Sequence, residues 1–213
     1  MTFKIFTLLL QAAVSTIGIS LVSIAIGFVI AILLSAANLS GKAIYSAPAR
    51  VFVSFFRGVP LLVQLLLIYT LLPAIGLNVP SIVAAIVGLS LCTAAYQAEN
   101  LRGGFASVPK GLIEAAEVTG LSPRQTFFRI RVPIALRLTL PALVNEAIMI
   151  LKSSSLVSVV GIIELTKMAQ DLASSTYLPI PIFLSAGLIY LVICSVIALI
   201  GRYAERRLAR TSI

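Results

Sequence analysis

The sequence lacks histidine altogether and is poor in cysteine and in charged residues. Its 213 residues include no His, two Cys and 11% charged residues, against 60% hydrophobic ones. So few polar side chains cannot cover a protein in contact with water, and we therefore expect an integral membrane protein. Cys92 and Cys194 each lie within an apolar run, where they are expected to be small buried hydrophobes, and no phosphate-binding glycine loop is present. A catalytic or metal site within this chain is not expected.

The hydrophobic residues are grouped into runs long enough to cross a bilayer. A hydrocarbon core of about 30 Å requires about 20 apolar residues in a helix. The third run (81–101) and the fourth (134–156) are diluted by polar residues, and the first (8–37) is longer than a bilayer requires. Four or six spans are therefore alternatives to five. The first run is also longer than the core of a secretory signal peptide, and we expect it to be retained. We predict one all-α membrane domain over residues 1–213, with five spans near 8–37, 51–72, 81–101, 134–156 and 182–200.

The basic residues gather on one side of the predicted membrane. With five spans, the basic stretches 42–57, 102–137 and 202–210 fall on the same side, whereas the other side keeps Lys4 and Lys167. Because cytoplasmic loops are enriched in Lys and Arg, we predict an N-terminus outside and a C-terminus in the cytoplasm. The net charge of +9 then places the chain beside anionic membrane lipid. Nucleic acid is not expected as a partner, because the charges are scattered over loops between apolar runs.

The polar segment 109–133 predicts a helical hairpin between the third and fourth spans. A first helix is expected to begin after Pro109 and to end before Gly120, which suits the left-handed position after a helix. Ser122 is expected to cap a second short helix, because Gln125 stands at the spacing of a capping box. The result is two short helices joined by a tight glycine turn.

This hairpin has the composition of a docking element. Ala115 and Ala116 are small enough to let another surface approach closely, and Phe127 and Phe128 offer apolar contact. An amphipathic hairpin lying on the inner leaflet would use the same aromatic residues together with neighbouring arginines. The residues alone do not decide between these two interpretations.

The hairpin resembles the cytoplasmic coupling loop of ABC importer permeases, which docks on the ATP-binding subunit. Three further segments, FFRGVPL at 55–61, YQAENLRGG at 96–104 and LKSSSLVSVVG with Glu-Leu at 151–165, are similar to the permeases that import polar amino acids. That branch includes importers of histidine, arginine, glutamine, glutamate, cystine and opines. The residues that match the coupling-loop pattern are Glu114, Ala115, Ala116, Gly120, Ile130 and Pro133.

The resemblance implies a type I importer permease that is not itself an enzyme. A separate ABC subunit would bind ATP and Mg, so no cofactor is expected in this chain. An extracytoplasmic amino acid-binding protein would deliver the solute to the loops at 73–80 and 157–181. A second permease subunit, either a copy or a paralogue, would complete the pathway. Family members of this length have five spans with the N-terminus outside, in the bacterial cytoplasmic (inner) membrane.

Two places depart from the family pattern. Val132 stands where leucine is commonest, a conservative change that leaves docking intact. Ser153 and Ser154 stand where many members carry an acidic or amide residue followed by threonine. If that acidic residue helps to hold cationic substrates, its absence argues against arginine or lysine as the cargo.

Polar residues inside the predicted spans are candidate substrate contacts, because a charged group at the centre of a span costs about 2.5–3.5 kcal/mol. A zwitterionic amino acid needs a cation for its carboxylate and an acceptor for its ammonium, which Lys152 and Glu99 could supply. Alternatively, Glu99 and Arg102 form a fixed ion pair near the membrane surface and Lys152 extends outward. A role without substrate contact is a further alternative, since in some importers only one permease subunit holds substrate. The candidates are Glu99, Arg102, Asn145, Lys152, Ser153 and Ser154.

Other functions fit the composition less well. The cargo of an importer permease could be a solute other than an amino acid. A secondary transporter would carry intramembrane acidic groups for ion coupling, but five spans without an internal repeat disfavour it. An intramembrane enzyme would need clustered catalytic groups, and Glu99, Glu146 and Asp171 form no obvious constellation.

Overall fold

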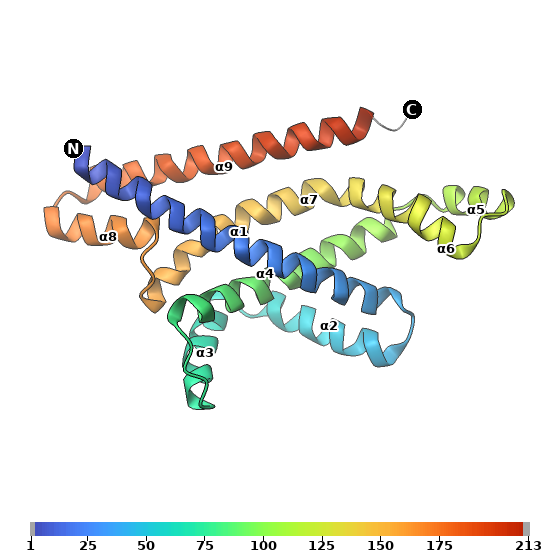
Figure 1. The fold of residues 1–213 in the computed structure, drawn as a ribbon, viewed down its shortest axis with the longest axis horizontal. Helices are drawn as coiled ribbons and strands as arrows, with labels where there is room; N and C mark the ends of the chain where they lie inside the picture. Colours follow the sequence, from blue (N-terminus) through green and yellow to red (C-terminus); the bar gives the residue numbers. More distant parts are fainter. Residues whose placement is uncertain (1–2, 211–213) are drawn as a thin grey trace.

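The computed structural model describes residues 3–210, which form helices and turns with no strand in that range. A π-helical turn (Phe127–Arg131) precedes α7, and a 3-10 turn (Ser154–Val160) follows it. The α-helices in chain order, as labelled in Figure 1, are α1 (Phe3–Leu39), α2 (Ala43–Gly58), α3 (Leu61–Ala74), α4 (Ser81–Ala106), α5 (Lys110–Val118), α6 (Pro123–Thr126), α7 (Val132–Ser153), α8 (Leu165–Thr176) and α9 (Pro179–Arg210).

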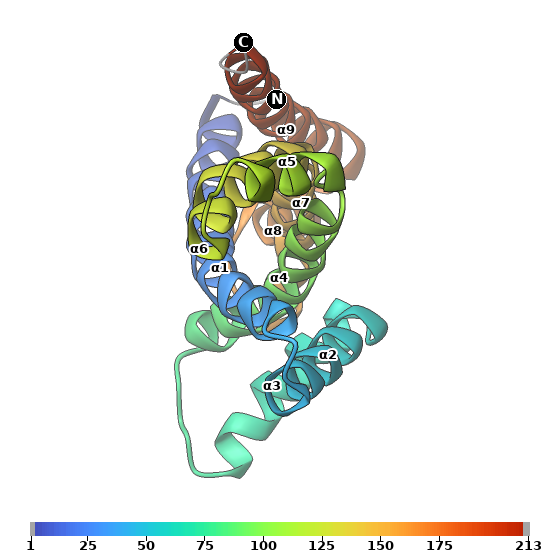
Figure 2. The same ribbon diagram turned by 90° about the vertical axis from the view of Figure 1, so that its right-hand side faces the viewer.

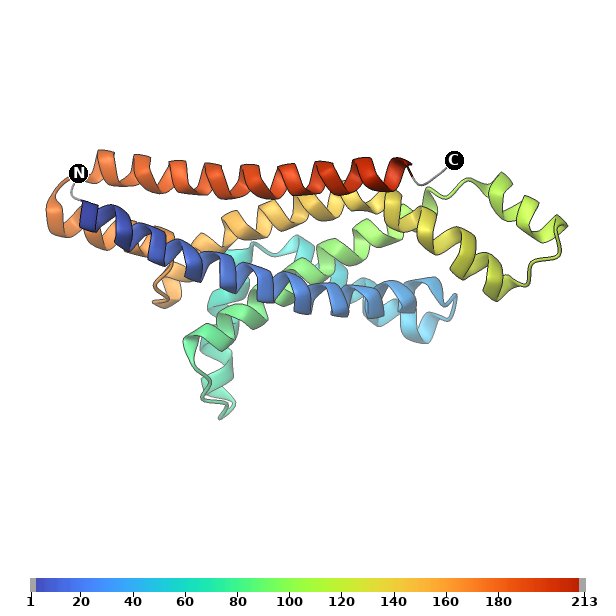
Figure 3. The same cartoon turned by 45° about the horizontal axis from the view of Figure 1, so that its top comes forward.

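Four long helices, α1, α4, α7 and α9, run roughly along the long axis of the molecule (Figures 1 and 3). The α5–α6 hairpin projects at one end of this bundle, and α8 lies at the other end, where α1 begins (Figure 1). Each of the four overlaps a helical stretch long and apolar enough to cross a membrane, and α2 with α3 would add a fifth span if the bent pair crosses as one. The chain is therefore an all-α membrane protein.

Small residues allow the long helices to approach closely, as they do in other membrane bundles. A Cβ atom at Gly27 of α1 would lie 2.9 Å from the Ser90 carbonyl oxygen of α4. A Cβ atom at Gly104 of α4 would lie 2.9 Å from the Ala135 carbonyl oxygen of α7. Of the two cysteines, Cys92 is buried in this packing as expected, whereas Cys194 on α9 is only partly buried.

The predicted span 51–72 is not one helix. It is divided between α2 and α3, whose axes differ by 110°. Pro60 has no N–H with which to continue the helix, so the Phe56 carbonyl loses its usual partner. The buried Gln64 side chain supplies the replacement, because its Nε2 donates to the carbonyl oxygens of Phe56 (2.8 Å) and Val59 (2.7 Å). The break is therefore held by specific hydrogen bonds, and α3 projects away from the bundle (Figures 1 and 2).

The segment expected to be a loop before the last span contains a helix, α8. Its N-terminus is capped by the fully buried Glu164 carboxylate, which accepts from the backbone N–H groups of Thr166 (2.9 Å) and Lys167 (2.7 Å). Tyr190 on α9 donates its hydroxyl to the same carboxylate at 3.0 Å. Thr16 on α1 accepts from the N–H of Leu165 at 3.0 Å. These bonds fix α8 between α1 and α9.

Candidate functional site

The first helix of the predicted hairpin at residues 109–133 forms as the sequence predicts. It is α5, which starts after Pro109 and ends one residue before Thr119. Gly120 has a φ of +79°, and its N–H donates to the carbonyl of Glu117 while that of Leu121 donates to the carbonyl of Ala116. This pair of bonds is the Schellman motif, which requires a left-handed residue at the glycine position. The tight glycine turn is confirmed.

The start of the second helix is also as predicted, but its end is not. Ser122 Oγ accepts from Gln125 N–H (3.3 Å) and Gln125 Oε1 accepts from Ser122 N–H (2.9 Å), which completes the capping box. The helix then continues through the π turn into α7 instead of stopping before the span. Because Pro133 cannot donate to the carbonyl four residues earlier, the backbone widens locally, and the Val132 N–H donates to the Phe127 carbonyl. The predicted second short helix is thus the beginning of the fourth long helix.

The hairpin presents an exposed surface of mixed character. Glu114 and Ala115 are exposed, and Val118, next along the same helical stripe, is 89% exposed. Glu114 forms no ion pair within residues 3–210. Ala116, by contrast, is only 5% exposed, so it packs inside the hairpin and does not offer the close approach expected of it. Ile130 and Pro133 are half-buried where the hairpin joins α7.

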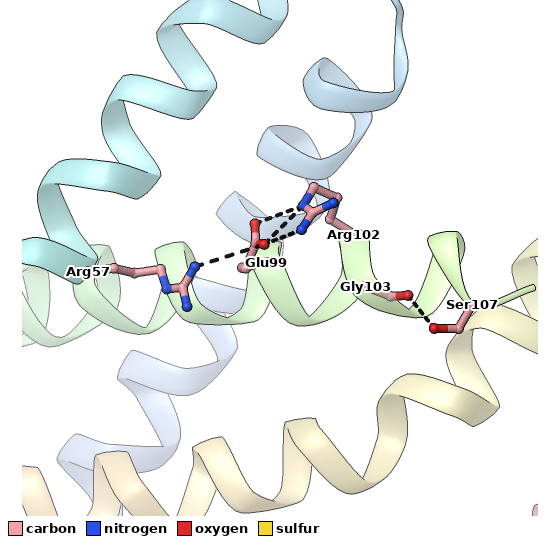
Figure 4. Close-up of polar contacts among 5 residues, drawn as sticks. All are labelled: Arg57, Glu99, Arg102, Gly103 and Ser107. Carbon is pink, nitrogen blue, oxygen red and sulfur yellow. Dashed lines mark hydrogen bonds and ion pairs between the residues drawn. The ribbon is translucent and has the colours of Figure 1, made fainter.

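Glu99 and Arg102 form an ion pair on α4, with Arg57 of α2 beside it (Figure 4). The Arg102 Nε donates to both Glu99 carboxylate oxygens at 3.0 Å, and its Nη2 lies against one of them. The Arg57 guanidinium lies 4.0 Å from Glu99 and 5.4 Å from the ring centre of Tyr96. These side chains are one quarter to one half exposed, so the pair is open to solvent or to a small ligand.

This ion pair borders a polar cavity of about 540 Å³ at the junction of α1, α2 and α4. Three guanidinium groups and one carboxylate line it, which leaves an excess of positive charge. Guanidinium groups bind carboxylates in a planar, two-point geometry, and a carboxylate can accept from an ammonium group. The arrangement can therefore hold a small zwitterion. The polar lining residues are Asn38, Ser46, Arg50, Ser54, Arg57, Glu99 and Arg102.

The candidates on the fourth span lie elsewhere. Asn145 and Lys152 are exposed on α7, and neither lines the polar cavity. Ser153 ends α7, while Ser154 is fully buried and donates to the Leu151 carbonyl at 2.8 Å. Lys152 and Glu99 are therefore not brought together as the two ends of one amino acid site within this chain.

One buried polar cluster was missed by the sequence analysis. Glu146 of α7 is 9% exposed, and its carboxylate accepts from the Thr93 hydroxyl of α4 at 3.3 Å. Gln97 Nε2 donates to the same hydroxyl at 3.2 Å. Two features of the sequence could have indicated this cluster. Glu146 is a carboxyl group within an apolar run, and Thr93 and Gln97 are polar residues four positions apart on the preceding run. Among residues 3–210, no group of three or more acidic, Cys or His side chains is placed to hold a metal.

Comparison with known proteins agrees with this geometry. The family described as "binding-protein-dependent transport system inner membrane component" matches residues 23–210. The nopaline transport system permease protein of Agrobacterium fabrum is 41% identical over 211 residues, covering 94% of this chain and 87% of the relative. The glutamine transport system permease protein of Escherichia coli K12 is 36% identical over 203 residues, covering 94% and 93%. A solved structure, described as an amino acid ABC transporter with histidines, has a TM-score of 0.89 at 32% identity and 94% coverage of each chain.

Proposed function

The chain belongs to the family of binding-protein-dependent transport system inner membrane components, and we propose that it moves polar amino acids or their close derivatives through an ATP-driven ABC importer. It is the permease subunit of such an importer, a multi-pass protein of the bacterial inner membrane. The observation that carries the proposal is the exposed α5–α6 hairpin, with its left-handed Gly120, on a fold shared with an amino acid ABC transporter. Cargo of this class is supported by relatives named for nopaline and glutamine.

The hairpin provides the contact for a separate ATP-binding subunit. ATP and Mg belong to that subunit, and the permease chain contributes no catalytic residue. The exposed Glu114 would pair with a basic or hydrogen-bonding group of the ATPase, while Ala115 and Val118 fill an apolar cleft. Ala116 keeps the hairpin compact, because it is buried within it. Closure of two ATPase subunits would then alternate the permease between inward-open and outward-open arrangements.

The polar cavity is the proposed substrate contact of this subunit. Arg57 or Arg50 would hold the α-carboxylate of the amino acid, and Glu99 would accept from its ammonium group. The Arg102 pairing keeps Glu99 in position until the ligand arrives. Asn145 and Lys152, exposed on α7, would serve the pathway only together with another subunit. An extracytoplasmic binding protein would dock at the α8 end of the bundle.

The test is ATP hydrolysis by the chain reconstituted in lipid with its ATP-binding subunit and binding protein, titrated with a panel of amino acids. Stimulation by one class of amino acid is the expected result, and it identifies the cargo. Assembly with no stimulation by any amino acid would contradict the amino acid assignment and leave the permease role. Uptake by the chain alone in vesicles, without ATP, would contradict the importer itself.

A further inference from the structure

The last helix, α9, lies at the edge of the bundle, with one face packed and the other open (Figures 1 and 2). The packed face is pressed against α7, because a Cβ atom at Gly201 would lie 2.5 Å from Val144 Cγ1. Leu199 and Tyr203 stand two positions to either side of Gly201, so they point away from α7, and they are 58% and 61% exposed. The open face of α9 is therefore available to a ligand at the edge of the bundle.

An apolar groove of about 450 Å³ runs between α9, α1 and α7. Its walls include Leu21 of α1 and both Val192 and Val196 of α9. Among the described residues that line it, Ser20 alone is polar, and its hydroxyl already donates to the Thr16 carbonyl oxygen at 2.7 Å. The groove thus offers no free hydrogen-bonding side chain, and it suits a hydrocarbon chain.

A second cavity, of about 330 Å³, lies further along α9 towards its C-terminal end. It is lined by Leu199, Arg202, Tyr203 and Arg206. Both arginines are exposed, and neither forms an ion pair with another residue in the described range 3–210. Glu205, in the same turn of the helix, does not line this cavity. The cavity therefore carries a positive charge that no neighbour neutralises, which suits an anion.

One stripe of α9 joins the groove to the basic cavity. Val192, Val196, Leu199, Tyr203 and Arg206 follow one another at spacings of three or four residues, so they share a helix face. Arg206 follows Val192 by 14 residues, which corresponds to about 21 Å along the helix. One leaflet with its headgroups is about 20–22 Å thick, half of the whole bilayer. Since Val192 is near the middle of the apolar run 182–200, the stripe extends from the bilayer centre to one surface.

We infer that the groove and the basic cavity form one binding site for an anionic phospholipid of the cytoplasmic leaflet. The acyl chain lies in the groove beside Val192 and Val196. The phosphate lies between Arg202 and Arg206, since guanidinium groups bind phosphate oxygens in a two-point geometry. A zwitterionic lipid fits less well, because its ammonium group would meet the same two arginines.

The groove excludes a soluble protein as the occupant. An acidic surface of the ATP-binding subunit would reach the arginines at the membrane surface, but it would leave the groove within the membrane unfilled. A phospholipid matches both parts, because it joins an anion to a hydrocarbon chain of one leaflet's length. The site does not depend on which solute the permease carries, so it goes beyond the proposed function.

The test uses the complete complex in phosphatidylcholine nanodiscs that contain a trace of a phospholipid with a photoreactive diazirine in its acyl chain. The probe is either phosphatidylglycerol or phosphatidylcholine, and the labelled positions are identified by mass spectrometry of peptides. The phosphatidylglycerol probe is expected to label the chain around Leu21 and Val196 more strongly than the phosphatidylcholine probe does. Unlabelled phosphatidylglycerol should compete with it.

Three variants test the two parts of the site. Arg202→Gln with Arg206→Gln should lower the labelling about tenfold or more, because each basic residue near the surface contributes about fivefold to binding of anionic lipid. Lys42→Gln with Lys110→Gln removes the same charge from exposed positions outside the cavity, and it should leave the labelling nearly unchanged. Val196→Trp fills the groove from a position that is 48% exposed, so it should exclude the acyl chain and leave the fold intact.

Equal labelling by the two probes, or full labelling of the arginine variant, would overturn the site and leave bulk lipid at this face. An equal loss of labelling in the lysine control would also overturn it, because overall charge would then explain the result. Protection from both probes in the complete complex, with labelling of the permease expressed alone, would show that another subunit covers the groove. That outcome would contradict the lipid site and leave the importer role untouched.

Discussion

Two buried side chains, Gln64 and Glu164, make hydrogen bonds that the backbone around them cannot make. Gln64 replaces the N–H that Pro60 lacks, and Glu164 accepts from the free N–H groups at the start of α8. In each case one residue fixes the angle between helices. The position of a single amide or carboxylate thus decides where a whole helix points.

Replacement of Gln64 is expected to destabilise the α2–α3 break. Gln64→Leu keeps the side-chain volume but leaves the carbonyls of Phe56 and Val59 without a donor, at about 1–3 kcal/mol for each group. A clear fall in the apparent Tm of the detergent-purified complex should follow. The control is Gln11→Leu on the exposed side of α1, expected to leave the Tm nearly unchanged. Equal Tm values for the two variants would contradict the bracing role of Gln64.

Replacement of Glu99 is expected to separate transport from stability. The Glu99–Arg102 pair is partly exposed, and exposed pairs contribute about 0.2–1 kcal/mol, so Glu99→Gln should barely change the Tm. Loss of the negative charge that pairs with the substrate's ammonium group should reduce substrate-stimulated ATP hydrolysis by about tenfold or more, which corresponds to about 1.4 kcal/mol. Glu205→Gln on α9, the same change at a carboxylate that does not line the polar cavity, is the control. If both variants retain full stimulation, the pair at Glu99 is structural only.

At the scale of elements, the hairpin is the part in which local rules and tertiary structure agree. Its turn depends on one left-handed residue with open space around it, so conformation alone, and not packing, demands glycine at position 120. Gly111, in the preceding helix α5, is also in open space but has ordinary helical geometry. The two positions therefore form a natural pair for mutation.

Gly120→Ala is expected to weaken coupling. The new Cβ meets no neighbour, so its cost is the left-handed backbone strain of about 1–2 kcal/mol. That strain should distort the hairpin and lower both co-purification of the ATP-binding subunit and stimulated ATP hydrolysis. Gly111→Ala should leave both unchanged, because alanine favours the helix. Identical behaviour of the two variants would show that the turn does not determine docking.

Local sequence rules predicted the hairpin well, because its caps and glycine involve residues only a few positions apart. Apolar runs likewise predicted α1 and α9. The α2–α3 break was missed because it depends on Gln64 reaching back eight residues, past a proline within an apolar run. Helix α8 was missed because its amphipathic sequence has too few apolar residues to suggest a span, and its cap involves α9.

The candidate site was only half predictable for a related reason. Spacing on one helix correctly placed Glu99 beside Arg102. Spacing does not give the rotation of one helix relative to another, so it could not show that Lys152 does not line the cavity that Glu99 borders. It also could not show that Glu146 faces Thr93. Those relations are set by close contacts between α4 and α7, such as that at Gly104.

For the molecule as a whole, the distribution of charge predicts its orientation in the membrane. The hairpin and the arginine-rich end of α9 lie at one end of the bundle, and α8 lies at the other (Figure 1). By the positive-inside rule, we expect the end with the hairpin to face the cytoplasm. Docking of an ATPase requires the same orientation.

Two cysteine variants test this orientation. Both variants carry Cys92→Ala and Cys194→Ala. In this background, Tyr177→Cys should react with a membrane-impermeant maleimide in spheroplasts. Val118→Cys should react only after the membrane is opened. The permease is expressed without its ATP-binding subunit and binding protein for this test. The two native side chains are 88% and 89% exposed in the chain by itself, so any difference in labelling reports the side of the membrane and not burial. The reverse pattern would invert the topology.

The helical path from Pro123 to Val160 continues through a π turn and ends in a 3-10 turn, so the fourth span starts in the hairpin itself. Its 38 residues are about 57 Å long, so a tilt of about 5° at one end would displace the other by about 5 Å. A small rotation imposed on the hairpin is thus amplified at the opposite end of the bundle without any relay of side chains. A small closing movement of the ATP-binding subunits would then be enough to open or close the permease at its opposite end.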